Sequence, residues 1–152
     1  MAPPRIMIVE ARYYAHISDE LARGATAALE AAGASYERVT VPGAFEIPAA
    51  IRFAVAAAAR GVATARFDGY VALGCVIRGE TTHYDYVCQE SARGLQELAR
   101  AHDLAIGFGI LTVENEAQAV ARAAVDRRNK GGEAARACLA MIEFKRRLGL
   151  AQ

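Results

Sequence analysis

The sequence predicts an α/β domain in which a parallel four-stranded sheet lies between two layers of helices. Two observations predict this fold. Short apolar runs typical of strands alternate with longer stretches of helical periodicity along the whole chain. Four strand–helix units in succession favour a parallel sheet that is covered on both faces. With 152 residues, the chain has the size of one domain with a substantial core. We therefore expect a single domain over residues 1–152, with residues 1–4 flexible.

The first unit joins a strand at residues 5–10 (RIMIVE) to a helix. Ser18 is expected to cap that helix, because serine is favoured at the position before the first helical residue. Asp19 and Glu20 would then lie in the first turn, near the positive end of the helix dipole. Gly33 supplies a stop signal.

The second unit begins with a strand at residues 36–41 (YERVTV). Pro42 and Gly43 break this strand. Pro48 suits the first turn of a helix, which we expect to run to about residue 60.

The third unit contains the near-continuous apolar run at residues 69–77, which is the pattern of a strand buried on both faces. A helix is expected at about residues 84–101, and the fourth strand at residues 105–113. Asn115, followed three positions later by Gln118, resembles a capping box and predicts the start of another helix.

The chain ends in a helix. The glycine pair at residues 131–132 is expected to interrupt the helix before it, so that a last helix covers about residues 133–148. This order of elements predicts a doubly wound sheet of flavodoxin-like topology, in which ligands bind beyond the carboxyl ends of the strands.

Composition excludes several classes of function. The chain has 18 basic and 17 acidic residues, so a net charge of +1 offers no field that would attract nucleic acid or an anionic membrane. Its apolar runs fall short of the roughly 20 residues of a membrane span, and it starts without a signal-peptide pattern. Cys75, Cys88 and Cys138 lie far apart, which argues against a disulfide framework or a metal site. We expect a cytoplasmic protein that binds neither metal, nucleic acid nor membrane.

The stretch GCVIRGET at residues 74–81 is close to a phosphate-binding P-loop, but Glu80 stands where the P-loop has lysine. The loop leaves a buried strand, turns at Gly79 and enters a helix, so its N–H groups meet a helix N-terminus. Without the lysine and a magnesium ligand set, a nucleotide triphosphatase is excluded. A site for one phosphate and an ordinary capped turn both remain open. His83 follows directly and is either a proton-transfer group, because histidine titrates near neutral pH unaided, or a structural residue.

Four stretches of the sequence resemble the lumazine synthase family. They are PGAFEIP at 42–48, GCVIRGETTHYDYV at 74–87, GFGILTVENEAQAVARA at 107–123 and NKGGEAA at 129–135. The resemblance covers nearly the whole chain. It implies a transferase of riboflavin biosynthesis that condenses 5-amino-6-(D-ribitylamino)uracil with 3,4-dihydroxy-2-butanone 4-phosphate, releasing phosphate and water, without a metal or organic cofactor. A flavin- or lumazine-binding paralogue with weak catalysis is the alternative.

The resemblance also implies roles for individual residues. His83 would transfer protons, Tyr13 would stack on the pyrimidine, and Glu46 would accept hydrogen bonds from the ribityl chain. Arg122 would pair with the phosphate. The substrate-binding positions are Tyr13, Ala44, Phe45, Glu46, Cys75, Val76, Ile77, Glu80, Thr81, Phe108, Arg122 and Lys130. The last three match positions that a neighbouring subunit contributes.

The expected assembly is a ring of five subunits with active sites between neighbours. An apolar share of 54% favours a subunit interface, and the resemblance gives the number five. It also makes riboflavin synthase a candidate partner. The near absence of an arm before the first strand, together with Arg128 before the last helix, favours a free pentamer over a capsid.

Overall fold

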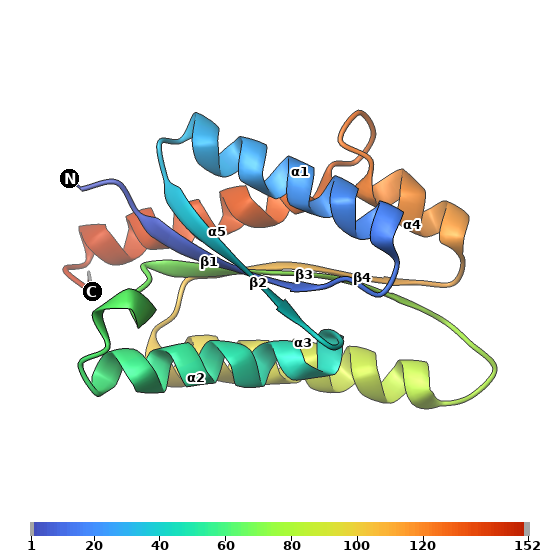
Figure 1. The fold of residues 1–152 in the computed structure, drawn as a ribbon, viewed down its shortest axis with the longest axis horizontal. Helices are drawn as coiled ribbons and strands as arrows, with labels where there is room; N and C mark the ends of the chain where they lie inside the picture. The colour runs from blue at the N-terminus through green and yellow to red at the C-terminus, as the bar shows by residue number, and fades with distance from the viewer. Residues whose placement is uncertain (1, 151–152) are drawn as a thin grey trace.

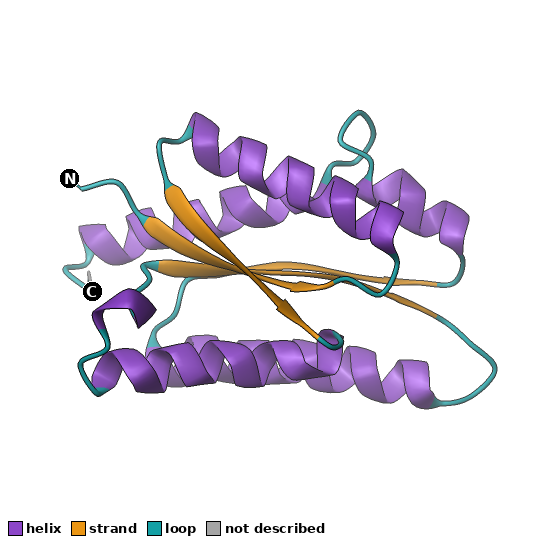
Figure 2. Cartoon of the chain, in the orientation of Figure 1, coloured by secondary structure: helices purple, strands orange, loops and turns teal. Residues whose placement is uncertain are grey.

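The computed structural model describes residues 2–150 and contains a parallel four-stranded sheet with the strand order β2-β1-β3-β4. Figure 1 shows the sheet edge-on, with α1, α4 and α5 on one face and α2 and α3 on the other; Figure 2 shows the same layers by type of element. The prediction of a doubly wound α/β domain is confirmed. The elements are β1 (Arg5–Ala11), α1 (Ala15–Ala31), β2 (Ser35–Val41), a 3-10 turn (Ala44–Glu46), α2 (Ile47–Ala59), a second 3-10 turn (Ala63–Ala65), β3 (Gly69–Ile77), α3 (His83–His102), β4 (Ile106–Val113), α4 (Glu116–Ala123) and α5 (Lys130–Arg147).

The sheet divides the core into two parts. Side chains alternate between the faces of a strand, so Ile8 packs with Leu21 of α1 on one face, while Val9 packs with Ile51 of α2 on the other. β1 and β3 lie in the centre of the sheet, and residues 69–75 of β3 are buried because helices cover both faces. This explains the near-continuous apolar sequence of that strand.

The start of α1 differs from the prediction. The helix begins at Ala15, and Ser18 lies inside it, buried, with a hydroxyl that has no hydrogen-bond partner in the described part of the chain. Consequently Asp19 and Glu20 lie beyond the first turn, and no side chain caps the helix. A contact between Arg12 and Asp19 holds the turn before α1 instead.

The glycine pair also acts differently from the prediction. Gly131 and Gly132 do not interrupt a helix but lie in the first turn of α5, and α4 has already ended at Ala123. A Cβ atom on Gly131 would lie 2.0 Å from the carbonyl oxygen of Leu21 in α1. The glycine therefore allows the backbones of α1 and α5 to approach closely.

Other local predictions are confirmed. The Asn115 side chain accepts a hydrogen bond from the Gln118 N–H (2.9 Å) at the start of α4. Pro48 lies in the first turn of α2. The other expected helices and strands start and end within a few residues of the observed ones.

Both ends of the described chain lie at the amino end of the sheet (Figure 1). The Pro4 carbonyl accepts a hydrogen bond from the Ser35 N–H at 3.0 Å. The expected flexibility of residues 1–4 stays a prediction, and residue 1 lies outside the described part. Within residues 2–150, none of the helices has the length and apolar character needed to cross a membrane.

Candidate active site

A cleft of about 530 Å³ opens at the carboxyl end of the sheet, where ligands bind in folds of this kind. Four segments form it: the end of β1 with the turn that follows, the turn before α2, the end of β3, and the start of α3. Its lining residues are Ala11, Tyr13, Tyr14, Gly43, Ala44, Phe45, Glu46, Cys75, Val76, Ile77, His83, Tyr86 and Val87.

The cleft brings together eight of the residues to which the sequence assigned a role. These are Tyr13, the segment 44–46, the segment 75–77 and His83. They come from four places in the sequence, and the parallel sheet brings them together because the ends of β1, β2 and β3 meet at one edge.

Exposed aromatic side chains form one wall of the cleft. Tyr13 is 79% exposed and Phe45 is 57% exposed. The Tyr13 ring meets the ring of Tyr14 edge to face, with centroids 4.9 Å apart, and Tyr14 in turn packs against the core. Burial raises the pKa of Tyr14, so its phenol stays protonated at neutral pH. Large apolar surfaces that face solvent at a cleft mark a place for a ligand or a second protein surface.

The end of β3 contributes backbone and a thiol to the cleft. Cys75 is buried, and this burial raises its pKa to about 11. The thiolate is the reactive form of cysteine, so the neutral Cys75 side chain is a poor nucleophile at physiological pH. Backbone groups of Cys75, Val76 and Ile77 remain available to a ligand at the strand end.

The loop after β3 is held by Arg78. Its guanidinium binds both carboxylate oxygens of Glu114 (2.9 and 3.0 Å) and reaches Asp85 at 3.3 Å. The guanidinium carbon also lies 4.3 Å from the centre of the Tyr84 ring. The amides of residues 79–82 donate to no acceptor within residues 2–150, so these N–H groups are free for an anion at the start of α3.

Glu80 and Thr81 lie in this loop, next to the cleft but not among its lining residues. Both are exposed. The Thr81 hydroxyl is 3.4 Å from the N–H of His83, the first residue of α3. The loop therefore leads directly to His83, whose side chain lines the cleft.

Phe108, Arg122 and Lys130 do not line the cleft. Phe108 is half exposed on the edge strand β4, in a shallow groove against α3. Arg122, on α4, donates to the Gln118 carbonyl at 3.1 Å, and Lys130, at the start of α5, pairs with Glu133 at 3.0 Å. A single chain thus leaves these three residues apart from the other predicted site residues.

Tyr86 and Val87 line the cleft, although the sequence had not singled them out. They lie three and four positions after His83, on one face of α3. That spacing was a usable signal once His83 was placed at a helix start. Ala11, Gly43 and Tyr14 complete the unpredicted part of the lining.

The described residues hold no group of three His, Cys, Asp or Glu side chains that could bind a metal ion. The lining of the cleft offers the His83 imidazole, aromatic surfaces, backbone hydrogen-bonding groups and the Glu46 carboxylate.

Fold and cleft together define a flavodoxin-like α/β protein with a small-molecule site at the carboxyl ends of its strands. The sequence profile of the 6,7-dimethyl-8-ribityllumazine synthase family matches residues 3–146. The chain belongs to this family.

Several relatives are similar to this chain over nearly their full length. The 6,7-dimethyl-8-ribityllumazine synthase 1 of Rhizobium meliloti is 58% identical over 97% of this chain and 95% of its own. The 6,7-dimethyl-8-ribityllumazine synthase of Agrobacterium fabrum is 54% identical over 98% of this chain and 99% of its own. The enzyme of that name from Paramagnetospirillum magneticum is 52% identical over 96% of this chain and 97% of its own.

Proposed function

We propose that the cleft is one half of the site at which this chain, a transferase of riboflavin biosynthesis, forms 6,7-dimethyl-8-ribityllumazine. The reaction condenses 5-amino-6-(D-ribitylamino)uracil with 3,4-dihydroxy-2-butanone 4-phosphate. One observation carries the proposal: the cleft gathers Tyr13, residues 44–46, residues 75–77 and His83 in one place. Family membership supports the same reaction.

The residues of the cleft suit a pyrimidine with a polyol chain. The Tyr13 face offers a stacking surface for the ring, and backbone groups at 75–77 can bind its polar edge. The Glu46 carboxylate is an acceptor for ribityl hydroxyl groups. Condensation of an amine with a carbonyl requires protons to move from nitrogen to the departing oxygen, and the imidazole of His83 can move them at neutral pH.

The phosphate of the second substrate needs positive charge that the cleft of one chain lacks. Its lining contains neither lysine nor arginine. The amides of residues 79–82 supply part of the field, but Arg78 is already bound to Glu114 and Asp85. A dianionic phosphate bound only here, beside Glu80, would be poorly neutralised.

We propose that a neighbouring copy of the chain supplies the missing groups. Phe108, Arg122 and Lys130 lie on β4 and on the elements that follow it, whereas the cleft lies over the ends of β1, β2 and β3. A contact between two different flanks is head-to-tail, and such contacts close into a ring when the rotation between neighbours divides a full turn. We propose a ring of five, with Arg122 paired to the phosphate.

Two measurements test the proposal. The purified protein should turn over the two substrates, with release of phosphate, and light scattering should give about five times 16.2 kDa. Tight riboflavin binding with negligible turnover would instead identify a weakly catalytic paralogue. A stable, active monomer would contradict the shared site. We also propose that the enzyme works in the cytoplasm and meets riboflavin synthase there.

A further inference from the structure

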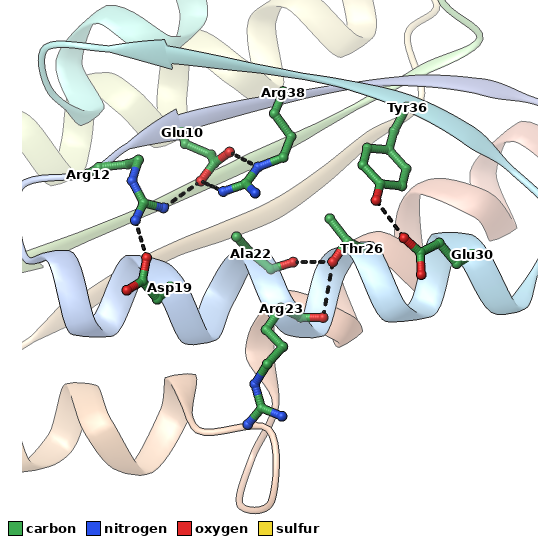
Figure 3. Close-up of polar contacts among 9 residues, drawn as sticks. All are labelled: Glu10, Arg12, Asp19, Ala22, Arg23, Thr26, Glu30, Tyr36 and Arg38. Carbon is green, nitrogen blue, oxygen red and sulfur yellow. Dashed lines mark hydrogen bonds and ion pairs between the residues drawn. The ribbon is translucent and has the colours of Figure 1, made fainter.

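An ionic chain built around one buried carboxylate lies beside the cleft. Glu10, at the end of β1, is only 2% exposed. Arg38 of β2 binds both oxygens of its carboxylate, at 2.6 and 3.0 Å. Arg12 donates to the same carboxylate at 2.8 Å and also contacts Asp19 of α1. Figure 3 shows these four side chains as one continuous series from β2 through β1 to α1.

The four groups neutralise one another. Two guanidinium groups face two carboxylates, so the series has no net charge, which is the condition for burying Glu10. The hydrogen bond with Asp19, followed by that with Glu10, raises the pKa of Arg12, so this residue keeps its charge. An arginine fork that joins two carboxylates fixes their relative position better than a single-point ammonium would.

Arg12 is the residue directly before the aromatic pair Tyr13 and Tyr14. Helix α1 begins at Ala15 with no side-chain cap and no acidic residue in its first turn. Local helix signals therefore do not hold the turn between β1 and α1. Tyr14 anchors the turn by packing against the core. The Arg12 guanidinium adds a polar tie, because it reaches back to Glu10 and forward to Asp19 of α1.

We propose that Arg12 is a positioning residue for the reaction. By joining the end of β1 to α1, it fixes the turn that carries Tyr13, and thereby the orientation in which the Tyr13 ring meets the pyrimidine. This inference rests on the proposed stacking role of Tyr13. Neither Arg12 nor Glu10 lines the cleft, so both act through the turn and not by touching substrate.

The experiment uses Arg12→Met, which keeps the length of the side chain but removes the fork. We expect the KM for ribitylaminouracil to rise about three- to tenfold, part of what the loss of one stacked ring costs. The KM for the butanone phosphate should stay within about twofold, because its proposed anchor, Arg122, is on another chain. Asp19→Asn leaves the Glu10 pairs in place and should shift the pyrimidine KM in the same direction by less; it serves if Arg12→Met does not fold.

Arg93→Met is the matched control. Arg93 on α3 also bridges two carboxylates, Glu90 at 2.8 Å and Glu97 at 3.1 Å, but both belong to the same helix, so Arg93 does not tie the turn that carries Tyr13. Its loss should leave both KM values unchanged. A rise of the pyrimidine KM equal to that in Arg12→Met would overturn the inference, because any lost ion pair would then have the same effect.

A double-mutant cycle with Tyr13→Ala separates positioning from general stability. If Arg12 acts through Tyr13, Arg12→Met should change the pyrimidine KM by less than about twofold in the Tyr13→Ala background. If the two substitutions instead raised the pyrimidine KM by independent factors that multiply, the inference about Arg12 would be overturned and the proposed function would stand. If Tyr13→Ala by itself left the pyrimidine KM unchanged, the proposed stacking role and the inference would both fail, while turnover of the two substrates would still support the proposed reaction.

Discussion

The chain presents two unlike groups of side chains that the family resemblance assigns to the site. The cleft group, made of Tyr13, residues 44–46, residues 75–77 and His83, surrounds a hollow with aromatic surface and no lysine or arginine. The flank group, made of Phe108, Arg122 and Lys130, carries two cations but does not line that hollow. The flank group has the cations that the cleft group lacks, and the cleft group has the imidazole that the flank group lacks. This difference supports the proposal that one chain holds two half-sites and that a complete site forms where two copies meet.

Loss of His83 should have the largest effect. Each proton transfer that an imidazole assists is worth roughly 10²-fold in rate, so His83→Ala should lower kcat by about that factor or more. Binding of the pyrimidine should change little, because stacking and backbone contacts remain. Steady-state kinetics with both substrates measure the two effects. Full activity across pH 6 to 8 would show that His83 has no such role.

Mixing two impaired variants tests the comparison itself. In rings assembled from equal amounts of His83→Ala and Arg122→Ala chains, about a quarter of the interfaces should pair an intact His83 with an intact Arg122. Activity should therefore rise well above that of either variant when the mixture is unfolded and refolded together. If the two residues served the same chain, mixing would restore nothing.

Arg122→Ala should have the next largest effect. A charge-assisted hydrogen bond contributes about 1.5–3 kcal/mol, or roughly ten- to a hundredfold in affinity. The KM for the butanone phosphate should rise by that factor, while the KM for the pyrimidine stays near its original value. Inorganic phosphate should also become a weaker competitive inhibitor. Equal changes in both KM values would place the phosphate anchor elsewhere.

Gly131→Ala should act on the flank group through packing. The added methyl would meet the Leu21 carbonyl at 2.0 Å, so α5 has to shift, at a cost of about 1–3 kcal/mol of stability. Chemical denaturation measures this loss. Gly79→Ala is the control for the stability measurement alone, because nothing lies within 4 Å of a Cβ there but its amide belongs to the proposed phosphate loop. We expect the shift at Lys130 to raise the KM for the phosphorylated substrate more than that for the pyrimidine.

Local sequence patterns predict much of the fold, and the two predictions that were wrong have the same cause. Asn115 and Pro48 were placed correctly because a helix end depends on a few neighbouring residues. The prediction that Ser18 caps the helix was wrong because α1 begins at Ala15, where the contact between Arg12 and Asp19 holds the preceding turn. The prediction that the glycines at 131–132 break a helix was wrong: they lie in the first turn of α5, where Gly131 allows α1 to approach closely. In both cases, contacts between residues of different elements determine where the helix begins, and the local sequence does not show such contacts.

Local sequence patterns likewise predicted only part of the candidate site. Composition and spacing led to the loop after β3 and to His83, and left a phosphate site and a capped turn equally open. The remaining positions came from the family resemblance. That resemblance already assigned Arg122 to a neighbouring subunit, and the structure leaves it outside the cleft. Tyr86 was missed because its place in the cleft follows from where α3 begins, which fixes the helix face that it shares with His83.

Residues 2 and 150, the two ends of the described chain, lie at the amino end of the sheet (Figure 1), whereas the cleft lies at its carboxyl end. A tag, a fluorophore or a second domain joined at either end would thus begin on the side of the sheet opposite to substrate entry. A donor joined to some copies and an acceptor joined to others would therefore test the proposed ring assembly by energy transfer, with both labels placed away from the cleft of their own chain.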